Sequence, residues 1–156
     1  MVGRQLPGAV RNAVRVLLGL VVVSVVMTVL MWVQSDDLIL SWARGNSAAR
    51  EILEEGGLAA LRESPTTPSI VPIAVVSTVM FALLAGVLVA FFVEGHNWAR
   101  LSLTATVLFG VLVCVLGFGY DLPTLFEVLL GFTLVLCLAE IFFLWHRETN
   151  TFMREV

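Results

Sequence analysis

Four long apolar runs constrain this chain more than any other feature of its sequence. They cover residues 16–33, 70–93, 101–120 and 122–145, and the first three contain no charged side chain. A helix needs about 20 apolar residues to cross a hydrocarbon core about 30 Å thick, because each residue advances its axis by about 1.5 Å. We therefore predict an all-α polytopic membrane protein, a single domain over residues 1–156 whose four transmembrane helices form a bundle.

The composition agrees with a membrane protein. Hydrophobic residues make up 59% of the chain and charged residues 13%, whereas soluble domains average about 45–50% and about 25%. The formal net charge of −3 argues against nucleic acid as a partner, since that partner requires a basic face. The first run follows three arginines, as in a signal peptide, but it is too long for the apolar core of one and no A-x-A-like cleavage site follows it. We expect it to be retained as a span.

The distribution of arginine predicts the orientation of the spans. Three arginines lie in the loop 34–69, and six lie in the two terminal tails and the 94–100 turn: Arg4, Arg11, Arg15, Arg100, Arg147 and Arg154. Cytoplasmic segments of membrane proteins carry the excess of basic residues. We therefore expect both termini in the cytoplasm, the long loop outside, and the bilayer to be the plasma (inner) membrane.

The short turns between spans carry residues typical of a membrane interface. Gly95 can adopt the left-handed conformation that ends a helix. Trp98 and Arg100 are expected to anchor one interface, with Arg100 reaching out to lipid phosphates, and Trp145 belongs to the same side. Tyr120 is expected to anchor the opposite interface.

The first of these turns also carries a resemblance. Its G-x-x-W-A-R pattern resembles the cytoplasmic turn of small four-span integral membrane proteins common in high-GC bacteria, and is formed here by Gly95, His96, Asn97, Trp98, Ala99 and Arg100. The four-span plan of that group covers the whole chain. The resemblance implies a bacterial multi-pass membrane protein. Many members of the group lack an assigned activity, so it implies topology more than function.

The outer loop 34–69 is too long for a turn and, by its length, too short for an independent core. Residues 36–44 and 48–55 each predict a short helix with one apolar side, and Gly45, Gly56 and Gly57 interrupt them. One hypothesis is an amphipathic flap on the outer bilayer surface with Ile39 and Trp42 inserted. A second is an element that binds a partner or covers a pore, and a third is a disordered loop.

Small residues in the spans predict where helices pack. In lipid, small side chains let two helix backbones approach closely. The second span has a small residue at every fourth position, and Gly110 lies in a similar pattern on the third span. The predicted packing residues are Thr78, Ala82, Gly86, Ala90 and Gly110.

The fourth span holds the candidate polar site. Thr133, Cys137 and Glu140 recur on one helical face, whereas Glu127 lies thirteen residues before Glu140 and therefore nearly opposite to it. Glu127 is near the outer end, where the helix N-terminus favours a carboxylate. Glu140 lies deeper, and an ionisable group inside a membrane is a functional candidate. The alternative is a structural acid that pairs with Arg100 or Arg15 at the cytoplasmic rim.

Motifs of known enzymes are not found in the sequence. It contains no H-E-x-x-H, G-x-S-x-G, C-x-x-C or phosphate-binding glycine loop, and the spacing of its two cysteines matches no metal or disulfide framework. We expect no enzymatic activity, cofactor or metal. The leading hypothesis is an accessory subunit, scaffold or partner-binding module that contacts the lipid bilayer and a membrane-protein partner or further copies of itself. The alternative is a small oligomeric channel or transporter that uses Glu140.

Overall fold

The computed structural model describes residues 6–120 and 122–154. Within them all regular structure is helical, and four helices are long and apolar enough to cross a membrane: α1 (Gly8–Val33), α4 (Ile70–Val93), α5 (Asn97–Gly117) and α6 (Thr124–Leu144). The remaining helices are α2 (Ser35–Gly45), α3 (Ser47–Glu63) and α7 (Arg147–Phe152). The predicted all-α fold with four spans is confirmed.

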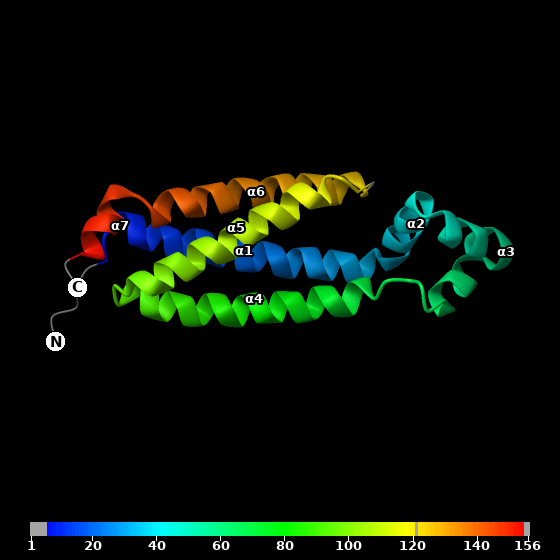
Figure 1. The fold of residues 1–156 in the computed structure, drawn as a ribbon, viewed down its shortest axis with the longest axis horizontal. Coiled ribbons are helices and arrows are strands. Elements are labelled where there is room, and N and C mark those ends of the chain that lie inside the picture. Colours follow the sequence, from blue (N-terminus) through cyan, green and yellow to red (C-terminus); the bar gives the residue numbers. More distant parts are fainter. Residues whose placement is uncertain (1–5, 121, 155–156) are drawn as a thin grey trace.

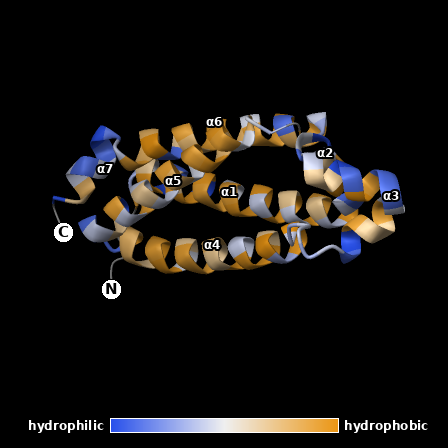
Figure 2. Cartoon of the chain, turned by 45° about the vertical axis from the view of Figure 1, so that its right-hand side comes forward, coloured by the Kyte–Doolittle hydropathy of each residue, from blue (hydrophilic) through white to orange (hydrophobic). Residues whose placement is uncertain are grey.

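The central helix of the bundle is α1. It lies between α4 and α6. In the view of Figure 1, α5 crosses α1 diagonally, from the last residues of α4 to the first residues of α6. The start of α1 and the end of α7 lie at one end of the bundle, called here the terminal end, and α2 and α3 form a headpiece at the other (Figure 1). Apolar residues cover the length of the bundle, and hydrophilic residues gather at its two ends (Figure 2). This distribution suits a bundle whose middle is surrounded by lipid.

The largest differences from the predicted span boundaries are at the starts of the first and third spans, and the other ends differ by at most three residues. Helix α1 begins at Gly8, eight residues before the predicted start at 16, because its first turns are held by packing: Ala9, Val10 and Ala13 are all buried. The third span, α5, begins at Asn97 instead of residue 101. Gly95 has φ 93, the left-handed conformation predicted for the residue that ends α4.

The packing face of α4 is only partly the predicted one. Thr78 meets α1, where its hydroxyl oxygen lies 2.6 Å from that of Thr28, and Ala82 is half-buried. Gly86 and Ala90, however, are exposed, and the buried residues of this helix are Ala85, Leu88 and Phe92. The reason is geometric: a four-residue step turns about 40° beyond a full helical turn, so a strict stripe rotates away from a straight contact within three steps.

Gly110 does pack between helices, as predicted. A Cβ built at this residue would lie 3.5 Å from the sulfur of Cys137 on α6, which is ordinary van der Waals contact. Cys114 and Cys137 are both buried and both free. The absence of a side chain at Gly110 therefore allows α5 and α6 to come together in the middle of the bundle.

The headpiece has a small core of its own, which corrects the expectation from its length. Ala43, Ala49 and Leu61 are buried together, and Ile39 and Trp42 pack against them. The headpiece itself therefore partly covers these two side chains. The Arg62 guanidinium also pairs with Asp36, which ties the end of α3 to the start of α2.

The two short helices predicted for the headpiece are present, and α3 differs from the prediction in its start and in its length. Helix α3 starts after Asn46, whose side-chain oxygen accepts hydrogen bonds from the amides of Ala48 and Ala49, a typical N-cap. Gly57 has φ 68 and breaks α3 into two segments. A further helical segment therefore follows the glycines, where the sequence predicted only an interruption.

Helix α7 was not predicted from the sequence. It folds back over the terminal end, where the Thr149 hydroxyl donates a hydrogen bond to the carbonyl of Phe143 and Phe152 joins the main core. The amide of Ala9 donates to the Glu148 carboxylate at 3.0 Å. These contacts hold the start of α1 and the chain after α6 together.

Candidate functional site

Glu140 is the most unusual polar residue in the bundle. It lies one turn before the end of α6, and its exposed fraction is 0%. Cys137, one turn earlier on the same face, is also buried and belongs to the main apolar core. The sequence therefore folds a carboxyl group into the interior, on the side of α6 that packs against its neighbours.

The carboxyl group of Glu140 has no partner. Neither Oε1 nor Oε2 has a hydrogen-bond partner within the described part of the chain, and no ion pair there includes this residue. The hypothesis that Glu140 pairs with Arg100 or Arg15 is therefore wrong for this structure. An ionised carboxylate without a partner is costly to bury, so the conformation favours the neutral acid.

Arg100 lies elsewhere because other residues bind it. Its Nη1 donates a hydrogen bond to Oδ1 of Asn150 at 2.5 Å, and its guanidinium carbon lies 4.5 Å from the ring centroid of Trp145. Its exposed fraction is 8%. Arg100 is therefore not a freely extended side chain: Asn150, which α7 brings to it, and Trp145 hold it against the terminal end.

The other predicted polar residues of α6 do not join Glu140 in one site. Thr133 is half-buried, and its hydroxyl donates to the carbonyl of Leu129 one turn earlier, which is a local bond within the helix. Glu127 is exposed in the first turn of α6. The structure therefore brings together only Cys137 and Glu140.

The three aromatic residues predicted as interface anchors lie at the ends of the spans. Trp98 and Trp145 are exposed at the terminal end, and Tyr120 is exposed at the end of α5 nearer the headpiece. Trp98 packs on Phe91 with ring centroids 4.9 Å apart. Trp145 is also structural, because its indole N–H donates to the Thr104 hydroxyl at 3.1 Å.

Sequence reasoning missed the polar cluster at the terminal end. Asn150, on the unpredicted α7, contacts both Arg100 and the carbonyl of Trp145. The one available signal was His146, whose ring nitrogen accepts a hydrogen bond from the amide of Glu148 and so starts a new helix. Without α7, Asn150 could not be placed beside Arg100.

Comparison of the chain with protein-family models, curated proteins and solved structures finds no match. A sealed carboxyl group can exchange a proton with water or face a cation only if the helices around it separate. Neither of the two hollows found at the terminal end is lined by Glu140.

Proposed function

We propose that this chain is a non-enzymatic integral membrane protein that binds a partner through its headpiece, as an accessory subunit or scaffold. The observation that carries the proposal is the small core of the headpiece, which holds α2 and α3 beyond the end of the bundle (Figure 1). An ordered element outside the spans offers a partner a fixed surface. A fixed surface binds at a lower entropic cost than a flexible loop.

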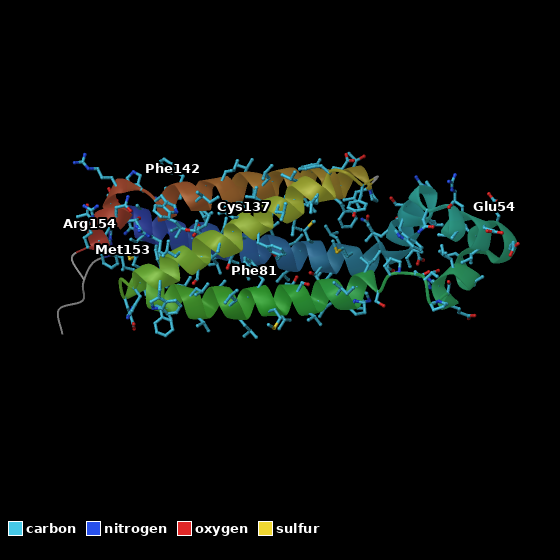
Figure 3. All side chains as sticks on the ribbon, viewed as in Figure 1. Glu54, Phe81, Cys137, Phe142, Met153 and Arg154 are labelled. Carbon is cyan, nitrogen blue, oxygen red and sulfur yellow. The ribbon has the colours of Figure 1, made fainter. Side chains whose placement is uncertain are left out.

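The exposed acids of α3 indicate the chemistry of that partner. Glu51, Glu54 and Glu55 are exposed and form no ion pair within the described residues, and Glu54 projects from the far end of the headpiece (Figure 3). A concentrated negative charge favours encounter with a basic surface. We infer a membrane-protein partner, or a peripheral one, with a basic patch at the level of the headpiece.

The test of this proposal is capture of the tagged full chain in native lipid particles. Compared with wild type, the combined change Glu51→Gln, Glu54→Gln and Glu55→Gln should reduce the recovered partner at least about tenfold, because charge pairs at an interface are lost. The control is Glu127→Gln, which removes an exposed acid from α6 and should retain the partner. Recovery of the chain alone, or equal recovery with all variants, would contradict the proposal.

We also infer that the terminal end faces the cytoplasm, since most arginines gather there, and that the membrane is the plasma (inner) membrane of a bacterium. Cysteines introduced at Ser47 and Thr151, in a chain with both native cysteines replaced by alanine, test the orientation. Both positions are exposed. On intact cells an impermeant thiol reagent should label the Ser47→Cys variant and not the Thr151→Cys variant; the reverse pattern would overturn the assignment.

The second candidate function is a small oligomeric channel or transporter. The specific observation in its favour is the buried, unpartnered carboxyl of Glu140, since intramembrane acids commonly mark ion or proton pathways. Proton flux would be detected in reconstituted vesicles loaded with a pH-sensitive dye. Flux that is present in wild type and lost in Glu140→Gln, at equal reconstitution, favours conduction over the partner-binding function.

A further inference from the structure

At the terminal end the bundle is hollowed beside Arg100. The hollow has a volume of about 460 Å³ and is lined by Asn97, Arg100, Trp145, Asn150, Met153 and Arg154. It brings together the first turn of α5, the residue that follows α6, and the end of α7. Figure 3 places Met153 and Arg154 at this end of the molecule.

The hollow is strongly cationic. Two of its lining residues are arginines, and none is an acid. Arg100 and Arg154 lie close enough to repel each other, and neither forms an ion pair within the described part of the chain. Two acids lie at the same end but have other partners. Glu94 contacts His96, and Glu148 accepts a hydrogen bond from the amide of Ala9. Two neighbouring cations that find no counter-charge among residues 6–120 and 122–154 favour an anion between them.

The guanidinium of Arg100 is held in position for such an anion. Asn150 accepts its Nη1 hydrogen bond and donates its own amide hydrogen to the carbonyl of Trp145 at 3.1 Å. Trp145 in turn donates to Thr104, whose hydroxyl donates to the carbonyl of Arg100 at 2.9 Å. This closed network fixes the arginine before any ligand arrives, which lowers the entropic cost of binding.

Arg100 keeps donors that the protein does not use. Its Nε is buried and has no hydrogen-bond partner, and among its guanidinium nitrogens only Nη1 is hydrogen-bonded to a described residue. An unsatisfied buried donor is costly, and this one belongs to a side chain that lines the hollow and is more than nine-tenths buried. Arg154 is exposed and adds a second guanidinium to the lining.

We propose that this hollow binds a phosphate group, which Arg100 and Arg154 hold between them. Guanidinium groups match the oxygens of a phosphate through paired, charge-assisted hydrogen bonds. Asn97 supplies a further polar group, while Trp145 and Met153 supply apolar walls suited to the glycerol part of a lipid headgroup. The site lies at the end of the spans, where the headgroups of a bilayer would lie.

Native mass spectrometry of the full chain in detergent tests the proposal with three probes. These are dioctanoyl phosphatidylglycerol, inorganic phosphate, and dioctanoylglycerol, which has the same chains without phosphate. We expect the phosphatidylglycerol to bind wild type and dioctanoylglycerol not to bind. Binding of inorganic phosphate as well assigns the site to free phosphate, and its failure to bind assigns the site to a lipid headgroup. Equal binding of dioctanoylglycerol overturns the proposal.

The variants assign binding to the hollow. Arg154→Gln should weaken phosphatidylglycerol binding at least about tenfold, because charge-assisted hydrogen bonds are lost, and Arg100→Gln should do the same. The matched control is Arg147→Gln, which removes an exposed arginine that lines the other hollow at this end and should change binding less than about twofold. If Arg100→Gln fails to fold, the exposed Arg154 still decides the outcome. Equal weakening by Arg154→Gln and Arg147→Gln would show only general attraction by charge and would refute the site.

Discussion

Replacing Glu140 by leucine is expected to stabilise the protein, by about 1–3 kcal/mol in the free energy of unfolding. The carboxyl group is fully buried and both of its oxygens are without a partner. Leucine has a similar size, adds no polar atom, and extends the apolar core that already contains Cys137 and Leu144. Removal of an unsatisfied polar group should therefore outweigh small differences in packing.

Two further variants make the Glu140 result interpretable. Glu140→Gln keeps polar atoms in the same place and should gain little, so melting temperatures in detergent should rank leucine above both glutamine and wild type. Glu127→Leu changes an exposed acid on the same helix and should alter stability by less than about 1 kcal/mol. If Glu140→Leu lowers the melting temperature, the carboxyl group has a partner, such as a bound cation or a second copy of the chain.

The Glu140 variants also bear on function. A stable Glu140→Leu protein that retains its headpiece partner would assign the acid no part in partner binding. A stable variant that loses ion flux would assign it to conduction, since the loss could not be attributed to unfolding. The functional role of Glu140 can therefore be tested separately from its effect on stability.

Leucine at Gly110 is expected to destabilise the bundle, whereas leucine at Gly86 is not. A Cβ at Gly110 would already lie 3.5 Å from the Cys137 sulfur, whereas nothing lies within 4 Å of one at Gly86. Both variants gain about 1 kcal/mol of intrinsic helix propensity, so the difference between them isolates packing. We expect Gly110→Leu to be less stable than Gly86→Leu by about 1–3 kcal/mol, because overpacking forces the helices apart.

Alanine variants refine the Gly110 prediction. Gly110→Ala adds only the Cβ at an ordinary contact distance and should be tolerated, so damage should appear only with the larger side chain. Thermal unfolding in detergent, followed by circular dichroism, measures all three variants. Equal melting temperatures for the two leucine variants would mean that α5 and α6 do not pack closely at this residue.

Much of the fold could be predicted because lipid imposes a simple rule. A chain inside a membrane must satisfy its own backbone hydrogen bonds, so each long apolar run becomes a helix. The placement of Glu127 and Glu140 on opposite sides of α6 also followed from helical periodicity, and the structure shows the first exposed and the second buried. These features depend on residues close together in sequence.

The partners of individual side chains could not be predicted in the same way. The stripe that includes Gly86 has small residues at regular intervals, yet the angle at which α4 meets α1 decides which of them are covered. Ile39 and Trp42 form a correct amphipathic pattern, yet they pack against the second half of the headpiece. Hydropathy measures how apolar a residue is and carries no information about which surface covers it.

The sequence by itself therefore determined that the chain is helical, how many spans it has, and which face of α6 carries Glu140. Only the tertiary structure decided that Glu140 has no partner and that Asn150 and Trp145 hold Arg100. The physical reason is the distance in sequence between interacting residues. A helix in lipid forms because of its own local composition, whereas segments far away in the chain surround a polar side chain. For Arg100, the hydrogen-bond partner is Asn150 on α7, fifty residues later in the chain.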